Sequence, residues 1–144
     1  NHPGQVSLPG GKPEHTDSDP GATARREAEE ETGLRQQDMH HMGYLAPVLT
    51  SSNFQLITAV AFMKKPVAVA HSELVPARDE VDEVWFQPLN HLVNLDNYIA
   101  QSMHRDGRKR EFWTIAETEP VVWGATAAVL RKLAFGLKSG HAIL

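Results

Sequence analysis

Apolar positions along this chain occur in short stretches separated by polar turns, a pattern typical of strands joined by tight connections. Residues 43–49 and 54–63 are rich in apolar, β-branched and aromatic side chains, and the polar residues 50–53 between them predict a hairpin turn. Residues 12–18 are polar and contain Pro13, so we expect a loop there. Further short strands are predicted at 5–8, 67–70, 80–86 and 111–115.

A helix is predicted over residues 22–32, which are rich in helix-forming residues. Ser18 or Asp19 can cap its first turn, and Pro20 suits the first helical position, where a missing N–H costs nothing. Gly33 is a natural C-terminal stop.

A second helix is predicted over residues 124–137, and one or two helical turns are expected within 89–100. The longer helix has apolar residues near one face, which we expect to lie in the core: Ala127, Val129, Leu130, Leu133 and Ala134. Strands that surround two helices predict an α+β or α/β sandwich.

The composition narrows the possible partners. The chain has 144 residues, of which 41% are hydrophobic and 22% charged, as expected for one globular domain. Its net charge of −4 argues against a duplex nucleic-acid surface. The absence of cysteine excludes disulfides and thiolate metal sites, and no apolar run approaches the roughly 20 residues that span a bilayer. We therefore expect neither a nucleic-acid nor a membrane partner, while the oligomeric state stays open.

The most informative feature is an acidic cluster in the first helix. Glu27, Glu30 and Glu31 share one helical face, where like charges repel unless a cation lies among them. Carboxylate oxygens suit Mg²⁺ or Mn²⁺. Such an ion can bridge a diphosphate and activate water, one glutamate can accept the water's proton, and Arg26 can hold Glu27. The alternative is a solvated acidic face.

The glycine turn before this helix is the second part of the candidate site. Gly10 and Gly11 let the backbone approach a metal or a phosphate because they carry no Cβ. Lys12 can reach a phosphate oxygen, although an ordinary surface lysine is the alternative.

Residues 26–34, Arg-Glu-Ala-Glu-Glu-Glu-Thr-Gly-Leu, resemble the second half of the Nudix box and match every fixed position. The upstream half of the box is a glycine, five residues, an acid and seven residues. Counting from Gly11 places Asp17 in the acidic slot, but eight residues then lead to Arg26; counting back from Arg26 gives Ser18.

This departure resembles the coenzyme A diphosphatase branch of the Nudix family. Residues 2–11, His-Pro-Gly-Gln-Val-Ser-Leu-Pro-Gly-Gly, are similar to a segment of that branch, with Leu8 replacing the usual Phe. Residues 79–84 and 122–127 are similar to two further segments, and the surroundings of Leu8 and of 23–33 resemble plant and organellar members most.

The resemblance implies a Nudix α/β/α sandwich with a mixed sheet, formed by residues 1–144 as one domain. Family members carry one or more strands before the segment at His2, so we expect an N-terminally incomplete domain. The implied reaction is metal-dependent hydrolysis of coenzyme A or acyl-coenzyme A to adenosine 3′,5′-bisphosphate and (acyl-)4′-phosphopantetheine.

The implied site has Glu27 and Glu31 as metal ligands and Glu30 as a ligand or the base. Arg26 orients these groups, and the Gly11 carbonyl completes the metal shell. His2 is a substrate contact by analogy only. The resemblance also implies a mitochondrial protein, with peroxisomal and cytosolic locations open.

Two weaker groups of residues have plain alternatives. Glu80 or Glu83 can supply a remote carboxylate, or both can be solvent-facing strand positions. The basic residues around 107 can meet the 3′-phosphate of coenzyme A or can simply be a charged hairpin tip: Arg105, Arg108, Lys109 and Arg110.

Three functions compete. The first is coenzyme A hydrolysis, and the second is Nudix hydrolysis of another nucleoside diphosphate such as ADP-ribose or NADH. The third is a non-catalytic Nudix-fold module. The segment from His2 favours the first, and the retained Arg26, Glu27, Glu30 and Glu31 argue against the third, since a binding module has no need of like charges on one face.

Overall fold

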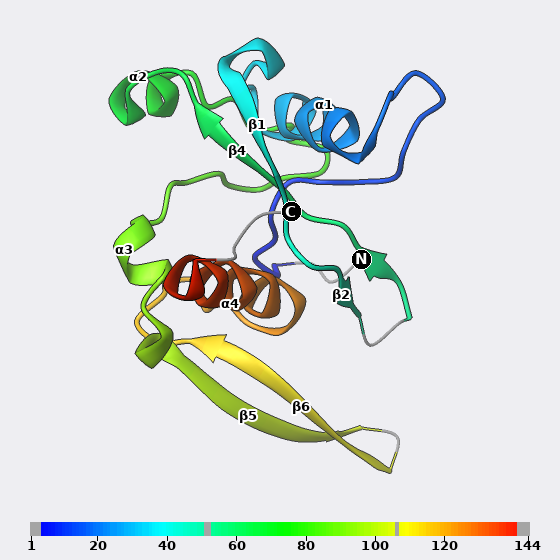
Figure 1. The fold of residues 1–144 in the computed structure, drawn as a ribbon, viewed down its shortest axis with the longest axis vertical. Coiled ribbons are helices and arrows are strands. Elements are labelled where there is room, and N and C mark those ends of the chain that lie inside the picture. Colours follow the sequence, from blue (N-terminus) through cyan, green and yellow to red (C-terminus); the bar gives the residue numbers. More distant parts are fainter. Residues whose placement is uncertain (1–3, 51–52, 106, 141–144) are drawn as a thin grey trace.

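The computed structural model describes residues 4–50, 53–105 and 107–140. Their elements, in chain order, are α1 (Pro20–Thr32), η1 (Gln36–Asp38), β1 (Met39–Tyr44), β2 (Val48–Leu49), β3 (Gln55–Leu56), β4 (Ala59–Met63), α2 (Val67–Ser72), α3 (Leu89–Leu92), η2 (Leu95–Asn97), β5 (Tyr98–Arg105), β6 (Arg108–Ile115) and α4 (Gly124–Ser139). In Figure 1, α1 and α2 lie beside β1 and β4 at one end, and the β5–β6 hairpin extends from α4 at the other.

The described strands form three antiparallel pairs, β1 with β4, β2 with β3, and β5 with β6. Mixed helices and strands confirm the predicted α+β class. The one mixed sheet that we expected is not seen in the described residues, where the strands pair two by two. The strand expected at 5–8 is wrong: its Val6 carbonyl accepts a hydrogen bond of 2.8 Å from the Thr126 hydroxyl, a side chain of α4.

Two other predicted strands are also wrong. Residues 67–70 belong to helix α2, whose first turn starts where the Val69 and Ala70 N–H groups donate to the Pro66 carbonyl. Residues 80–86 form no strand, because the Glu80 and Val81 N–H groups close a turn onto the Ala77 carbonyl. In both segments, backbone hydrogen bonds between near neighbours in the sequence decide the conformation. They outweigh the strand preference that the β-branched and alternating residues had suggested.

The hairpin prediction at 50–53 is confirmed in its described residues, since β2 and β3 pair and the Thr50 N–H donates to the Phe54 carbonyl at 2.8 Å. Strand β6 contains the predicted 111–115 but begins at Arg108. Its partner β5 was not predicted, because 98–105 is a polar stretch without clear alternation.

Helix α4 organises the core, and its predicted apolar face is confirmed. Ala127 and Ala134 pack with Tyr98, Ile115 and Val122 in one buried cluster. Its Val129 joins Leu45 and Val48 in a second cluster. The two clusters share α4, so this helix links the β5–β6 hairpin to the β1–β4 half of the molecule.

Helix α1 has the predicted ends. The Asp19 carboxylate accepts from the Ala22 N–H at 2.9 Å, Pro20 is the first helical residue, and Gly33 ends the helix at φ 79°. The segment after α2 follows the end of α1, since the Val75 N–H donates to the Thr32 carbonyl at 2.8 Å. Among the described residues, no helix is both long and apolar enough to cross a bilayer.

Candidate metal and phosphate site

Arg26 is the centre of the candidate site, and its guanidinium first of all ties the preceding loop to α1. Nε and Nη2 donate to the two carboxylate oxygens of Asp17 at 3.2 and 3.1 Å, and Nη2 also donates to the Lys12 carbonyl at 3.1 Å. Only 6% of the Asp17 side chain and 13% of the Arg26 side chain are exposed. The hydrogen bond from Arg26 is the main reason that the pKa of Asp17 falls to about 2.

Arg26 also holds two glutamates of its own helix. Its Nη1 lies 3.0 Å from Glu27 Oε1 and 2.8 Å from Glu30 Oε2. The predicted contact between Arg26 and Glu27 is therefore confirmed. A fork of several N–H donors can serve both the loop and the helix, which a single ammonium group does less well.

The glycine turn lies directly against the helix. A Cβ atom on Gly11 would lie 2.3 Å from Glu27 Oε1, whereas a Cβ on Gly10 would meet no atom within 4 Å. The Gly10 N–H donates a hydrogen bond to the Glu31 carboxylate. The missing side chain at Gly11 is thus what allows the turn to approach the first glutamate, whereas its approach to a metal or phosphate stays a prediction.

Glu31 is a partly buried carboxylate of the site whose pKa is raised. Burial is the main cause that raises its pKa, followed by the negative charge of Glu27, with smaller contributions from Glu80 and Glu30. The Gly10 N–H opposes this shift. Hard oxygen donors crowded by like charge fit a divalent cation, because the cation removes the repulsion.

The three glutamates do not point to one place. Glu27 and Glu31 meet the glycine turn, while Glu30 lies against Arg26 with 58% of its side chain exposed. In the part of the chain that the structure describes, no three acidic or histidine side chains are arranged to enclose a metal ion. The residues therefore fit a cation held by Glu27 and Glu31, with Glu30 one step removed.

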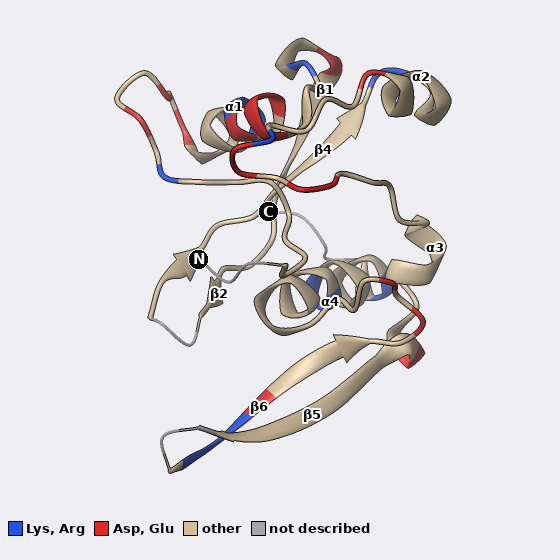
Figure 2. Ribbon diagram, turned by 180° about the vertical axis from the view of Figure 1, so that it is seen from behind, with Lys and Arg blue, Asp and Glu red and all other residues tan. Residues whose placement is uncertain are grey.

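The structure separates the two candidates for a remote carboxylate. Glu80 is close enough to Glu31 to raise its pKa, and the turn that carries it is joined to α1 by a 3.1 Å hydrogen bond from the Ala77 N–H to the Glu31 carbonyl. Glu83 is not among the main causes of this shift. Figure 2 shows the acidic segment after Ala77 beside the acidic face of α1.

The predicted basic contacts lie in different places. Lys12 is exposed at the glycine turn, with its carbonyl bound to Arg26. Arg108 and Arg110 lie on β6 near the end of the hairpin, and Lys109 pairs with Glu111 at 3.0 Å. Figures 1 and 2 both place this hairpin beyond α4 and away from α1. The structure thus places the Lys12 backbone, but not the β6 arginines, at the Arg26 guanidinium. Arg105 stays a prediction, and His2 lies outside the described residues.

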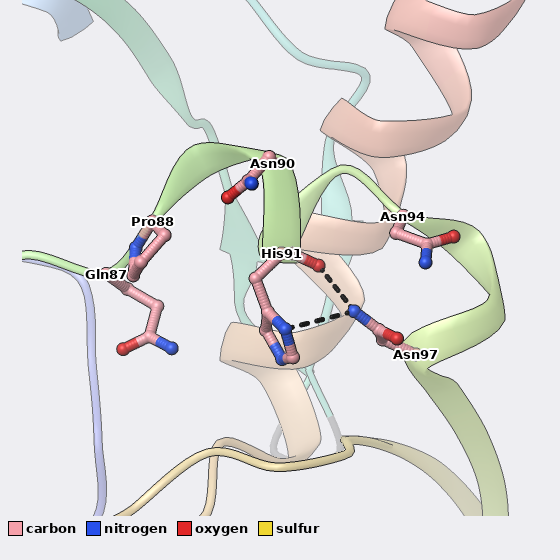
Figure 3. Close-up of a pocket in the computed structure, with 6 residues that line it drawn as sticks. All are labelled: Gln87, Pro88, Asn90, His91, Asn94 and Asn97. Carbon is pink, nitrogen blue, oxygen red and sulfur yellow. Dashed lines mark hydrogen bonds between the residues drawn. The ribbon is translucent and has the colours of Figure 1, made fainter.

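A cavity of about 510 Å³ lies elsewhere, at α3 and η2 (Figure 3). Its lining contains no Asp, Glu, Lys or Arg: Gln87, Pro88, Asn90, His91, Asn94 and Asn97. Within it, the Asn97 amide donates to the His91 carbonyl at 2.8 Å. No carboxylate lines this cavity, so it does not share the acidic chemistry of the candidate metal site.

Sequence reasoning did not include Asp17 and Thr23 in the site. The Thr23 hydroxyl donates to Asp17 Oδ2 at 2.9 Å, and Thr23 is only 6% exposed. Asp17 had a signal, since it occupies the acidic slot counted from Gly11. Thr23 had none, because a threonine in a helix is ordinary until the loop that folds onto it is known.

Comparison with known proteins found a matching family and similar bacterial proteins. The NUDIX domain family model matches residues 1–105. The chain is 35% identical over 133 residues to a protein of Yersinia enterocolitica named uncharacterized Nudix hydrolase NudL, a match covering 92% of this chain and 66% of that protein. A protein of the same name from Klebsiella pneumoniae is also 35% identical, over 92% of this chain and 67% of its own length.

The chain therefore belongs to the Nudix family. Within that family, its similarity is to bacterial proteins named as Nudix hydrolases, and it spans about two thirds of their length, 66% in the Yersinia protein. Family membership supports a divalent cation and a small-molecule substrate.

Proposed function

We propose that this chain hydrolyses the diphosphate bond of coenzyme A or acyl-coenzyme A with Mg²⁺ or Mn²⁺. The observation that carries the proposal is the contact of the Gly10–Gly11 turn with Glu27 and Glu31, two carboxylates whose repulsion a cation would relieve. The choice of coenzyme A rests on the resemblance of residues 2–11 and 122–127 to coenzyme A diphosphatases.

In the proposed reaction, Glu27 and Glu31 would hold the cation, and the Gly11 carbonyl would be a further ligand. When bound, the divalent cation neutralises the diphosphate and lowers the pKa of a water molecule. The water oxygen bonds to phosphorus, the bond from phosphorus to the bridging oxygen breaks, and a glutamate accepts the water's proton. Glu30 is the proposed base or third ligand, because Arg26 fixes it within one turn of both metal-binding glutamates.

Substrate contacts are proposed only at the glycine turn. The exposed backbone of Gly10 and Gly11 and the Lys12 ammonium can meet phosphate oxygens there. Glu80 is the proposed remote carboxylate, because its charge already reaches Glu31. The bacterial relatives give no support for a mitochondrial or peroxisomal location, so none is proposed.

The test is turnover of a substrate panel by the purified protein. Coenzyme A, succinyl-coenzyme A, ADP-ribose and NADH are each incubated with Mg²⁺ or Mn²⁺, and the products are separated by chromatography. We expect adenosine 3′,5′-bisphosphate and 4′-phosphopantetheine from coenzyme A, and no product when EDTA removes the metal. Rapid turnover of ADP-ribose or NADH, without turnover of any coenzyme A compound, would contradict the coenzyme A proposal. It would favour another nucleoside diphosphate as the substrate.

A further inference from the structure

The loop between the glycine turn and α1 is closed by one buried carboxylate. Asp17 Oδ2 accepts hydrogen bonds from the Glu14 N–H at 2.9 Å, the Thr23 hydroxyl at 2.9 Å and Arg26 Nη2 at 3.1 Å. The Asp17 N–H in turn donates to the Glu14 carbonyl at 3.0 Å. The Asp17 side chain therefore connects the loop at Glu14 to the first two turns of helix α1.

Thr23 is the fixed member of this group. It lies on α1, it is 6% exposed, and the only hydrogen bond of its hydroxyl among the described residues is the one donated to Asp17. Replacing the hydroxyl with a methyl group would leave Asp17 Oδ2 with one donor fewer in a place that water barely reaches, and a buried acceptor that loses its donor is costly.

From Asp17 the contacts lead to the cation-binding face. Asp17 holds Arg26 by a two-point contact, and Arg26 holds both the Lys12 carbonyl and Glu27. Lys12 is the residue after Gly11, whose Cα lies against Glu27. Rotation of the Arg26 fork would consequently move the glycine turn and Glu27 together.

We infer that Thr23 is a positioning residue that acts through Asp17 and Arg26 to set the distance between the glycine turn and Glu27, and so controls the affinity for the divalent cation. We call Thr23, Asp17 and Arg26 the loop latch. The inference rests on the proposed function only in assuming that the glycine turn and Glu27 bind a cation. It requires nothing of the identity of the substrate.

The loop latch also explains the unusual spacing of the motif. Eight residues separate Asp17 from Arg26, one more than the family pattern, and Asp is shorter than Glu. The Glu14–Asp17 turn brings the carboxylate back to Arg26, and the Thr23 hydroxyl fixes it there. A threonine with a free rotation of its hydroxyl is a suitable donor for a carboxylate that approaches from a longer loop.

The test measures binding of Mn²⁺ alone, by isothermal titration calorimetry and by electron paramagnetic resonance of free Mn²⁺. We expect Thr23→Val to weaken Mn²⁺ binding by about 10-fold and Asp17→Asn by up to about 100-fold, the range seen when groups that orient metal ligands are removed. Thr23→Ser keeps the hydroxyl and should restore an affinity close to that of the original chain.

The matched control is Thr32→Val. Thr32 is also a buried threonine of α1, 6% exposed, but its hydroxyl donates to the Ala28 carbonyl of the same helix. We expect it to lower the melting temperature as Thr23→Val does while leaving Mn²⁺ affinity unchanged. Equal Mn²⁺ affinity in the original chain, Thr23→Val and Asp17→Asn would refute the loop latch, as would equal losses in Thr23→Val and Thr32→Val.

The outcomes separate the two proposals. Mn²⁺ binding that depends on Thr23, without hydrolysis of coenzyme A, would keep the loop latch and remove the proposed substrate. In a chain that hydrolyses coenzyme A, the loop latch predicts that excess Mn²⁺ restores the kcat of Thr23→Val, because its defect lies in metal affinity. A lowered kcat at saturating Mn²⁺ would contradict it.

Discussion

Glu31 shows how a single residue can be unfavourable for the metal-free protein and still suit its function. Burial and the charge of Glu27 raise its pKa, so at neutral pH the ionised side chain destabilises the fold. A group with a raised carboxyl pKa contributes stability below its unfolded value, and this contribution is lost as the pH rises through the folded value. A cation bound at Glu31, as proposed, would offset this destabilisation.

We therefore expect Glu31→Gln to raise the melting temperature of the metal-free protein at pH 7 and to lose the increase that Mn²⁺ gives the original chain. Hydrolysis should fall by about 100-fold or more, the scale of a lost acid–base or metal-binding group. Differential scanning fluorimetry with and without Mn²⁺, between pH 4 and pH 7, would test both parts. Full activity with Gln at this position would exclude the role of Glu31.

Proton competition gives this prediction its pH dependence. Because the pKa of Glu31 is raised, protons displace the cation at a higher pH than they would from an ordinary glutamate. The stabilisation by Mn²⁺ should decline on acidification in the original chain. In Glu31→Gln the side chain at position 31 does not titrate. It should therefore contribute nothing to a decline of Mn²⁺ stabilisation on acidification.

At the scale of elements, the glycine turn and α1 form one unit only because Gly11 has no side chain. Gly11→Ala would place a Cβ 2.3 Å from Glu27 Oε1, while Gly10→Ala would meet nothing within 4 Å. Displacing Glu27 by about 1 Å is expected to cost about 100-fold in kcat/KM. Gly10→Ala is the matched control and should have a much smaller effect, as measured by turnover and by the melting temperature of both variants.

A second element, the connection from β6 to α4, depends on Thr118. Its buried hydroxyl donates to the Ile115 carbonyl and accepts from the Val122 N–H, both at 3.0 Å. Thr118→Val leaves that buried N–H without a partner and should cost about 1–3 kcal/mol of unfolding free energy, whereas Thr118→Ser should retain most of the stability. Urea unfolding of the two variants would measure the difference; an unchanged Thr118→Val would show that the connection does not need this bond.

Elements with their own boundary signals could be predicted from the sequence. Asp19, Pro20 and Gly33 define α1, and the apolar face of α4 defines the core, because these signals are local. The helix at 67–72 and the turn at 77–81 could not, since a few backbone bonds decided between states of similar propensity. The same holds for the site. The acidic cluster of α1 could be predicted from its spacing, but the contact of Thr23 with Asp17 depends on how the loop folds back.

At the scale of the whole molecule, the acidic cluster of α1 and the basic residues of β6 lie at opposite ends (Figure 2). The acidic face of α1 and the segment after Ala77 lie together, while the β6 arginines lie beyond α4, as the two opposite views in Figures 1 and 2 agree. The core clusters on α4 hold the two ends apart. Arg26 is the basic side chain that contacts the carboxylates, and the Lys12 backbone is bound to it. A charged hairpin tip is the simpler interpretation of Arg108 and Arg110.

This separation predicts different results for two sets of substitutions. The double change Arg108→Ala and Arg110→Ala should alter kcat/KM for coenzyme A by about two-fold at most, because surface substitutions away from a site change free energies by about 0.5 kcal/mol. Lys12→Ala should raise KM by about 10-fold, the value of a lost charge-assisted contact to phosphate. Steady-state kinetics with coenzyme A and with 3′-dephospho-coenzyme A would measure both. If instead the hairpin variant lost affinity for coenzyme A but not for the dephosphorylated compound, β6 would have to reach the 3′-phosphate, either by a movement of the hairpin or from a second copy of the chain, because the described fold holds it away from α1.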